Sequence, residues 1–528
     1  MNALDYSVVA AYLGGLLMFG FWLRHQSTGQ DYFLGGRSMG WFPLTLSTMA
    51  TQLSAISFVS APAFVGMREG GGLKWLTYEF SLPLAMILVM FVITPALYRA
   101  GIVSIYEFLE DRFGRSTRLL ISASFQIVRS FSTGIMVYAM ALILEAVLGI
   151  ELWQSVLVVG VITLLYATSG GMKAVVYGDA IQMVLIFGGL LLVAGYALTE
   201  TGGFAAFWRD VDPGRLVAVD FGSLGLSGDE FGFLPMLFGG FVLYASYYGC
   251  DQTQAQRILS ARDVGDARKL LFANGLLRFP LVLLYCFVGL LVGVAVVNDP
   301  GLAARIPAEK PDYMMPIFIL ERLPHGIIGL LLVAILSAAM SSLSSAVNSL
   351  AAVTLDDLGS VGIKPKDPAG QIIWARGISV FWGLAILVMS LFAGSIAPTV
   401  IEAINKVGSA LYGPVLGVFL LGMLRTRASG TGASIGLLAG VFLNLYLWKA
   451  QPQIFWMWWN FIGLTVTVVV ALVVSSLMGR EVATSSHTET EDVSMMFRSP
   501  YSFVLIAVFA AIVVISVFIR NLQAWFSP

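Results

Sequence analysis

Polar side chains interrupt several long apolar segments of the chain, where burying them in lipid is costly unless they pair or bind a ligand. One of these segments contains residues 47–58, which are rich in small and hydroxyl side chains, and it continues to Pro62 and Gly66. The pattern favours a helix that breaks in mid-membrane, because a break frees backbone carbonyls that can coordinate a cation. Close packing of helices through small residues is the alternative.

A serine cluster marks a second such segment. Ala338, Ser341, Ser342 and Ser345 recur at spacings of three and four, which places them on one face of a helix. Uncharged hydroxyl and carbonyl oxygens are ligands that Na⁺ accepts. The alternative is that the hydroxyls bond back to carbonyls of their own helix.

Asp179 follows Tyr177 and Gly178 at the start of another apolar segment. Taken as an isolated residue it suits the N-cap of a helix, since aspartate is a preferred cap. The functional interpretation is a carboxylate beside a cation path. The sequence leaves both interpretations open.

The composition places these segments in a membrane protein. Of the 528 residues, 58% are hydrophobic and 12% are charged, against roughly 25% charged residues in a typical soluble protein. These values exclude a water-soluble enzyme, a disordered scaffold and a coiled coil. The net charge of −1 offers no basic surface to nucleic acid.

Residues that could build a metal or catalytic cluster are few and scattered. Cys250 and Cys286 lie in apolar runs, and the three histidines, His25, His325 and His487, are far apart in the sequence. This spacing predicts neither a disulfide framework nor a zinc site. No nucleophile with a nearby base and no cofactor motif stands out, so we expect a protein that is not an enzyme and needs no cofactor.

Apolar windows of about 20 residues predict the membrane spans. Fourteen windows satisfy this length, at residues 6–23, 41–66, 76–98, 119–148, 151–168, 180–198, 232–250, 271–297, 324–352, 373–394, 398–423, 431–449, 453–477 and 500–520. Lys and Arg, among them Arg257, are about twice as frequent in one alternate set of loops as in the other. Because basic loops stay inside, we expect both termini outside.

Several motifs together resemble the sodium:solute symporter family, which includes bacterial sugar, proline and sialic-acid symporters and animal glucose, iodide, vitamin and monocarboxylate carriers. They run in order from residue 31 to about residue 475. The motifs are residues 31–37, Gly170-Gly171, residues 174–176 and 179–182, Asp251-Gln252, residues 256–262, the serine-rich segment, Gly413-Pro414 and Leu421-Gly422.

The resemblance implies an all-α polytopic membrane protein of about 14 transmembrane helices, with a five-plus-five inverted-repeat core that contains broken helices. The expected organisation is an accessory N-terminal helix, two repeats, additional helices, a cytoplasmic linker and a C-terminal helix. These units correspond to residues 1–30, 38–200, 230–425, 426–480, 481–499 and 500–528.

The resemblance also implies the sodium ligands. By matched position, the main site uses the carbonyls of Ala50, Leu53 and Ala338 and the hydroxyls of Ser341 and Ser342. A second site, found in some members, corresponds to Asp179, Ser344 and Ser345. Na⁺ is therefore the expected coupling ion, and one or two ions per cycle remain open.

Substrate residues transfer less directly. In the sialic-acid carrier, an arginine that binds carboxylate stands at the position that matches Ser132 here. Arg129 lies about one turn from this position. The candidates that match substrate positions, or neighbour them, are Gln52, Ser54, Ser57, Glu79, Arg129, Tyr244, Tyr247, Arg278 and Lys406.

Three basic residues inside predicted spans, Arg129, Arg278 and Lys406, face one acidic candidate, Glu79. Unpaired charges in a membrane are expensive, so we expect an anionic solute, a carboxylate or sugar acid, in Na⁺-coupled symport by alternating access. A neutral sugar and a proton-coupled carrier using Asp179 or Glu79 are the alternatives, and either arginine could instead extend to an interface. The expected partners are the solute, Na⁺ and the lipid of a bacterial inner (plasma) membrane; the oligomeric state stays open.

Overall fold

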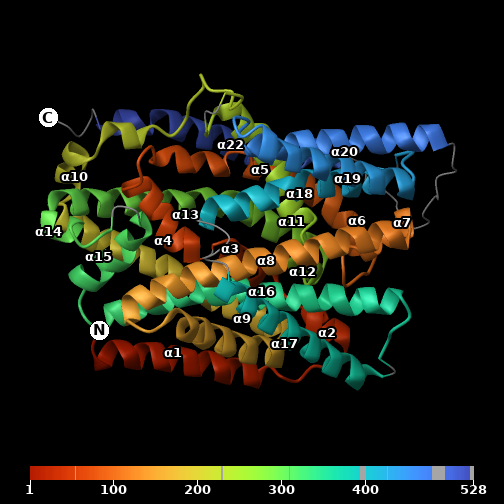
Figure 1. The fold of residues 1–528 in the computed structure, drawn as a ribbon, viewed down its shortest axis with the longest axis horizontal. Helices are drawn as coiled ribbons and strands as arrows, with labels where there is room; N and C mark the ends of the chain where they lie inside the picture. The colour runs from red at the N-terminus through yellow and green to blue at the C-terminus, as the bar shows by residue number, and fades with distance from the viewer. Residues whose placement is uncertain are drawn as a thin grey trace.

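The computed structural model describes residues 1–53, 55–227, 230–307, 310–365, 367–392, 400–424, 426–478 and 494–523. Over these residues the chain is helical and forms no β-strand, only the isolated bridges Met39–Ala261 and Asp220–Gly232. Most of the long helices run along the long axis of the molecule, side by side (Figure 1). The all-α expectation is confirmed for this part of the chain.

The described residues contain eleven helical segments that are long and apolar enough to cross a membrane. They are α1 (Ala3–Trp22), the segment Leu73–Arg99, α8 (Arg115–Leu148), α9 (Leu152–Glu200), α13 (Val264–Asn298), α16 (Ile327–Ser360), α17 (Pro368–Phe392), α18 (Val400–Met423), α19 (Gly430–Ala450), α20 (Met457–Met478) and α22 (Pro500–Phe518). The pair α3 (Trp41–Gln52) and α4 (Ala55–Gly66) is bent by 57° at its junction, and it raises the number of candidate crossings to twelve if the pair counts as one span.

The expected count of fourteen spans is not confirmed, and the difference has two local causes. The spans expected at 151–168 and 180–198 both fall within the range of α9, in which two helical segments meet at a kink at Gly171, with φ 58° and ψ −151°. The span expected at 232–250 is the π-helical turn η5 (Pro235–Gly239) continuing directly into α11 (Gly240–Gly249), and together they are shorter than the other candidate spans. Gly171 permits the break because glycine adopts positive φ without steric cost.

Shorter helices connect the spans or build the segment Leu73–Arg99. They are α2 (Gly29–Leu34), η1 (Gly35–Arg37), η2 (Leu73–Glu79), α5 (Leu82–Leu88), η3 (Val89–Ile93), α6 (Thr94–Arg99), α7 (Glu107–Phe113), α10 (Phe204–Asp210), η4 (Pro213–Leu216), α12 (Gln252–Leu259), α14 (Pro300–Ala303), η6 (Pro311–Tyr313), α15 (Met314–Arg322), α21 (Ser494–Arg498) and η8 (Ile519–Asn521).

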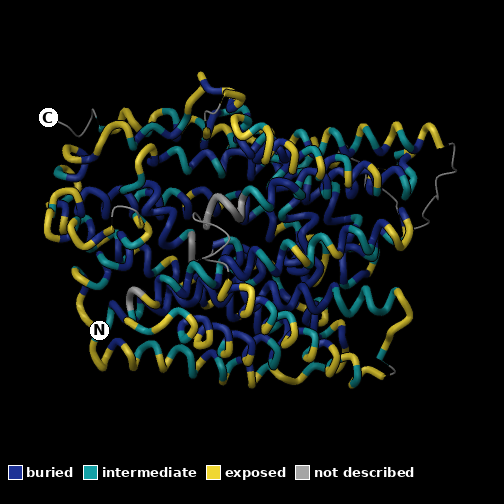
Figure 2. The backbone as a smooth tube through the Cα atoms, viewed as in Figure 1, coloured by how far each residue is buried: buried dark blue, intermediate teal, exposed yellow. Residues whose placement is uncertain are grey.

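Helix α16 forms the centre of the core. Every residue from Leu331 to Val353 is buried, and the interior of the bundle is buried along most of its length (Figure 2). A helix buried on all sides needs small residues where neighbours approach closely, and the alanines and serines of residues 337–346 meet this need. The serine cluster is therefore at the middle of the molecule.

Helices α4 and α13 touch through their backbones. A Cβ atom on Gly66 would lie 2.1 Å from the carbonyl oxygen of Gly289, and one on Gly293 would lie 2.5 Å from the carbonyl oxygen of Gly66. Such close approach is possible only where both surfaces lack side chains. This contact fixes α4, the second half of the broken helix, against α13.

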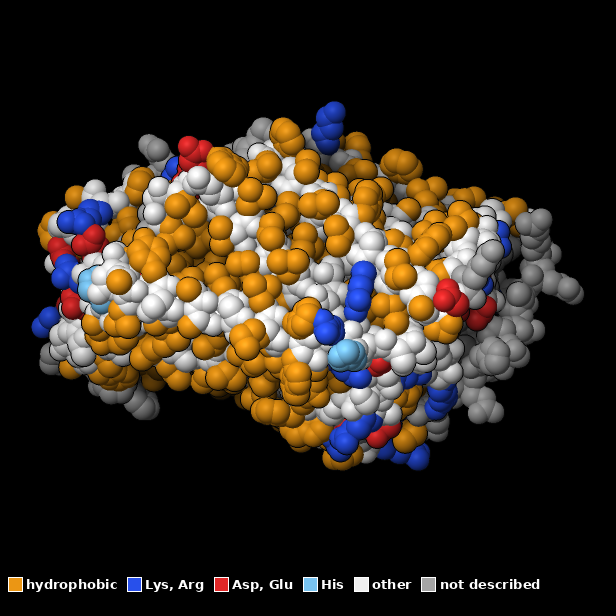
Figure 3. Space-filling view, turned by 90° about the horizontal axis from the view of Figure 1, so that it is seen from below, with side chains coloured by type: hydrophobic (Ala, Val, Ile, Leu, Met, Phe, Trp, Pro, Cys, Tyr) orange, Lys and Arg blue, Asp and Glu red, His pale blue; other side chains and the backbone are white. Residues whose placement is uncertain are grey.

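The outer surface is apolar where lipid would contact it. Figure 3 shows hydrophobic side chains over most of one face, with charged side chains gathered at the left end and from the lower middle to the lower right of the view. Exposed apolar residues of this kind include Phe21 and Trp22 on α1, Val184 on α9, and Phe381 and Leu384 on α17. This distribution is that of a protein embedded in a bilayer.

The start of α1 and the end of α22 (Pro500–Phe518) lie at the same end of the molecule (Figure 1). Helices α10 and α14 lie there as well. Of the predicted linker 481–499, residues 481–493 lie outside the described residues, and α21 (Ser494–Arg498) follows them. The proposed division of the chain into repeats stays a prediction.

Candidate functional site: a polar cavity beside a buried carboxylate

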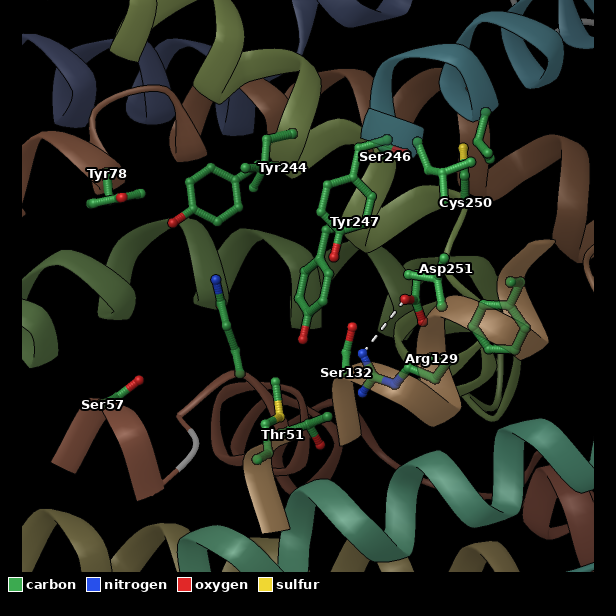
Figure 4. Close-up of a pocket in the computed structure, with 18 of the residues that line it drawn as sticks. Thr51, Ser57, Tyr78, Arg129, Ser132, Tyr244, Ser246, Tyr247, Cys250 and Asp251 are labelled. Carbon is green, nitrogen blue, oxygen red and sulfur yellow. Dashed lines mark ion pairs between the residues drawn. The ribbon is translucent and has the colours of Figure 1, made fainter. Parts of the chain in front are cut away.

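A cavity of about 210 Å³ lies beside the break between α3 and α4. Helices far apart in the sequence contribute to it, as Figure 4 shows for ten labelled residues from the broken helix, η2, α8, α11 and the turn before α12. Its lining is rich in aromatic rings, namely Trp75, Tyr78, Tyr106, Phe125, Tyr244, Tyr247, Tyr285 and Tyr412. Such a lining with a few polar groups is typical of a binding site for a small solute.

Seven of the nine predicted substrate residues line this cavity: Gln52, Ser57, Glu79, Arg129, Tyr244, Tyr247 and Arg278. Ser54 lies outside the described residues. Lys406, near the start of α18, is half-buried and is not among the described residues that line the cavity. Most of the predicted substrate residues therefore lie around one cavity.

Each buried arginine of the cavity has its own carboxylate partner. Arg278 Nε lies 3.3 Å from Glu79 Oε1, which also accepts a hydrogen bond from the Tyr244 hydroxyl at 3.2 Å. Arg129 Nη1 lies 3.6 Å from Asp251 Oδ2 (Figure 4). The expectation of three cations facing only Glu79 was wrong, because Asp251 supplies a second negative charge and Lys406 is not in the lining.

Three polar atoms of these pairs have no hydrogen-bond partner among the described residues. They are Arg129 Nε, Arg278 Nη1 and Glu79 Oε2, and each is buried. Buried polar atoms are nearly always paired with protein, water or ligand. Arg129, Arg278 and Glu79 all line the cavity, so two donors and one acceptor without partners belong to residues of its lining.

The main predicted sodium ligands lie where α3 ends and where α16 crosses the core. Ala50, Leu53, Ala338, Ser341 and Ser342 are all buried. Helix α3 ends at Gln52, and the last carbonyls of a helix have no intrahelical partner. On α16, the Ser342 hydroxyl donates to the Ala338 carbonyl at 3.3 Å, whereas Ser341 Oγ has no partner among the described residues.

Asp179 lies inside α9, past the break at Gly171, so the N-cap interpretation of this residue was wrong. The carboxylate is fully buried, and its Oδ2 accepts hydrogen bonds from Ser47 at 2.7 Å, Thr51 at 3.3 Å and Ser345 at 3.5 Å. Ser344, the other predicted ligand, donates instead to the Ser341 carbonyl at 3.1 Å.

Arg257 completes this cluster, and it was not predicted to do so. Its Nη2 lies 2.7 Å from Asp179 Oδ2, and both side chains are almost completely buried. The sequence interpretation had placed Arg257 among the basic residues of inward loops. Its side chain is instead buried inside the bundle. Both Asp251 and Arg257 belong to the motif residues at 251–262. Their membership in a family motif was the feature of the sequence that could have indicated a functional role for them.

Helix α12 carries Arg257, and all of its residues are buried although most are polar. Gln252 donates to the Val103 carbonyl at 2.8 Å and accepts from the Ile105 amide at 2.9 Å. Asp251 caps the helix by accepting from the Thr253 amide at 2.7 Å. One short helix therefore joins the cavity, through Asp251, to the Asp179 cluster, through Arg257.

Comparison with known proteins decides the family. The model of the sodium:solute symporter family matches residues 32–440. The chain belongs to this family. The symporter is accordingly a membrane transporter of the Na⁺-coupled class and not an enzyme.

Several animal proteins resemble the symporter over most of its length. A putative sodium-dependent multivitamin transporter of Drosophila melanogaster is 33% identical over 86% of this chain and 76% of its own. The human sodium/iodide cotransporter is 32% identical over 84% and 70%. Human sodium-coupled monocarboxylate transporter 1 is 32% identical over 83% and 71%. Since these relatives are animal proteins, they give no support to the expected bacterial membrane.

The fold also resembles a solved structure. A Na⁺-coupled sialic acid symporter in a substrate-bound outward-open state superposes with a TM-score of 0.82 at 22% identity, covering 92% of this chain and 99% of the other. At this identity the likeness concerns the fold. It supports the helical arrangement that brings α3, α9 and α16 together.

Proposed function

We propose that the symporter carries a small organic anion, a carboxylate or sugar acid, together with Na⁺ by alternating access. The observation that carries this proposal is the pair of unpartnered guanidinium N–H groups, Arg129 Nε and Arg278 Nη1, in a cavity lined by both residues. Charge-assisted hydrogen bonds from arginine to a carboxylate are short and strong. Relatives named for iodide, monocarboxylates and sialic acid give further support.

A neutral sugar is the second candidate, and two observations favour it. The pairs Arg278–Glu79 and Arg129–Asp251 leave these four residues with no net charge. Glu79 Oε2 is an unpartnered acceptor that a sugar hydroxyl could satisfy. An anion must instead share the arginines with their carboxylates, so substrate charge becomes the property to measure.

Sodium enters the proposal through the broken helix. We propose that the carbonyls of Ala50, Leu53 and Ala338 and the hydroxyls of Ser341 and Ser342 hold it. Binding there would fix the end of α3, next to Thr51 and Gln52 of the cavity. Linkage then requires that the solute tighten Na⁺ binding as much as Na⁺ tightens solute binding.

The energetics separate the two candidate solutes. A potential of 100 mV contributes roughly 2.3 kcal/mol per charge, and a tenfold Na⁺ gradient contributes about 1.4 kcal/mol. One Na⁺ with a neutral sugar therefore gains about 3.7 kcal/mol, whereas one Na⁺ with a monovalent anion gains only about 1.4 kcal/mol. Uptake of an anion by one Na⁺ would not depend on voltage.

The membrane orientation is part of the proposal. The start of α1 and the end of α22 lie at the same end of the molecule, which is consistent with an even number of crossings (Figure 1). The larger share of Lys and Arg in the opposite loops supports placing that end outside. The two inverted repeats at 38–200 and 230–425 remain the proposed basis of alternating access.

The test is uptake into proteoliposomes loaded without Na⁺. Labelled lactate, pyruvate, sialic acid, galactose and proline are each supplied with an outside pulse of Na⁺ or K⁺, with and without an inside-negative potential. We expect Na⁺-dependent uptake of an acid and no uptake in K⁺. Uptake of galactose with none of the acids would refute the anionic substrate, and uptake driven only by a pH gradient would refute coupling to Na⁺.

A further inference from the structure

The Asp179 cluster has the composition of a cation site. A fully buried carboxylate receives hydroxyl groups from two other helices, Ser47 and Thr51 on α3 and Ser345 on α16. A buried carboxylate requires a counter-ion, because isolated charges are not stable away from water. What distinguishes this cluster is that the chain itself supplies the cation.

Arg257 is held tightly in that position. Its Nη2 donates to Asp179 and also to Ser345, its Nε donates to Ser47 at 2.7 Å, and its Nη1 donates to the Thr253 carbonyl. All three nitrogens thus have partners within the cluster or in α12. The contacts of α12 with its neighbours fix the base of the side chain.

Further contacts hold α12 in place. Gln256 Nε2 donates to the Phe33 carbonyl and to Asn348 Oδ1, and Thr253 Oγ1 lies 3.0 Å from Ser349 Oγ. The guanidinium is therefore part of a buried network that spans several helices. It is not a surface side chain that enters the cluster by chance.

We infer that Arg257 is a tethered cation that occupies the second cation position at Asp179, so that the symporter binds one Na⁺ and admits a second only when this guanidinium is removed. The inference rests on the proposed function, in which the main Na⁺ binds elsewhere on α3 and α16. A Na⁺ added beside Asp179 would set two positive charges against one carboxylate. At a separation of about 4 Å and an effective dielectric of about 20, their repulsion weakens Na⁺ binding roughly a thousandfold.

A second observation indicates where a Na⁺ would bind once the guanidinium is gone. Asp179 Oδ1 is buried and has no hydrogen-bond partner among the described residues. With Arg257 replaced by a neutral residue, Asp179 Oδ2 and the hydroxyls of Ser47 and Ser345 also become available. Carboxylate and hydroxyl oxygens of this kind are suitable Na⁺ ligands.

The experiment counts labelled Na⁺ bound per molecule of the purified full-length protein in detergent, with K⁺ as the competing ion. We expect one Na⁺ for the wild type, two for Arg257→Gln, and one for Arg257→Lys, which keeps the positive charge. The double variant Arg257→Gln/Asp179→Asn should return to one, because the carboxylate is lost. Two Na⁺ in the wild type, or one in folded Arg257→Gln across pH 6 to 8.5, would overturn the inference.

A second measurement covers the case in which Arg257→Gln does not fold. The wild-type rate of solute uptake should depend on Na⁺ concentration with a Hill coefficient near one, and a coefficient near two with two Na⁺ per solute would overturn the inference. Failure of the proposed function looks different: no Na⁺ would bind to the wild type, and no solute uptake would respond to Na⁺.

Discussion

Replacing Glu79 by glutamine removes one negative charge from the cavity and preserves the size of the side chain. Glu79 is 2% exposed, and Oε1 is 3.3 Å from Arg278 Nε. An anion bound on the far side of that guanidinium would lie about 6 Å from the carboxylate, where repulsion at an effective dielectric of about 20 amounts to about 3 kcal/mol. Glu79→Gln should therefore lower the KM for an anionic solute by up to about a hundredfold.

The same change acts in the opposite direction on a neutral sugar. A sugar hydroxyl would lose a charged acceptor, Glu79 Oε2, and hydrogen bonds to charged groups contribute about 1.5–3 kcal/mol. Its KM should rise by about tenfold or more. The sign of the change in KM thus reports the charge of the solute.

The assay is Na⁺-driven uptake of labelled lactate and galactose into proteoliposomes, with KM measured for each. Glu69→Gln is the matched control, because Glu69 is exposed in the loop after α4 and is not among the described residues that line the cavity. Removing one partner of a buried ion pair also costs about 3–5 kcal/mol of stability, so thermal unfolding of each variant is recorded first. A raised or unchanged lactate KM in folded Glu79→Gln would refute the reasoning.

Three further substitutions follow from the described contacts. Asp251→Asn keeps the cap of α12 but leaves Arg129 without its carboxylate, so thermal unfolding should show a loss of about 3 kcal/mol. Gly66→Ala sets a methyl group against the Gly289 carbonyl, and its folded yield should fall, since such overpacking costs about 1–3 kcal/mol or more. Ser341→Ala removes an unpartnered hydroxyl and should raise the Na⁺ concentration for half-maximal uptake about tenfold, as loss of about 1.4 kcal/mol of binding requires.

Each of these variants has a matched control. For Asp251→Asn the control is Asp263→Asn, which changes an exposed helix cap. For Gly66→Ala it is Gly188→Ala, whose added methyl group meets nothing within 4 Å. For Ser341→Ala it is Ser337→Ala, which is on the same helix as Ser341 and removes a hydroxyl that donates to Tyr12 on α1. A loss of stability in Asp263→Asn equal to that in Asp251→Asn would contradict the role of the ion pair. Unaltered folding of Gly66→Ala would disprove the backbone contact, and an equal Na⁺ response in Ser337→Ala would remove Ser341 from the site.

The apolar windows predicted the membrane class and most helices, because lipid imposes length and composition on each span separately. The same reasoning placed two windows, at 151–168 and 180–198, on either side of Gly171, where two helical segments meet at a kink. Family motifs placed Glu79 and Arg278 at a common site, and the structure brings them within 3.3 Å. The sequence could not predict this contact itself.

The partners Asp251 and Arg257 were missed for a definite reason. Both lie in a polar stretch that resembles a loop, since its hydrophilic residues satisfy no rule for a membrane span. Their burial depends on carboxylates and guanidinium groups that are 78 or more residues away in the chain. Local composition carries no information about such pairings, and so the charge balance of the cavity was misjudged.

The second half of the broken helix, α4, has one side whose residues can change and one side whose residues cannot. On α4, Ser57 faces the cavity, whereas Gly66 and the Pro62 carbonyl lie against the glycines of α13. A substitution on the cavity side can alter the preferred solute without disturbing the contact with α13. The family includes relatives named for vitamins, iodide and monocarboxylates, and a helix with one constrained face and one free face lets new substrates evolve on an unchanged frame.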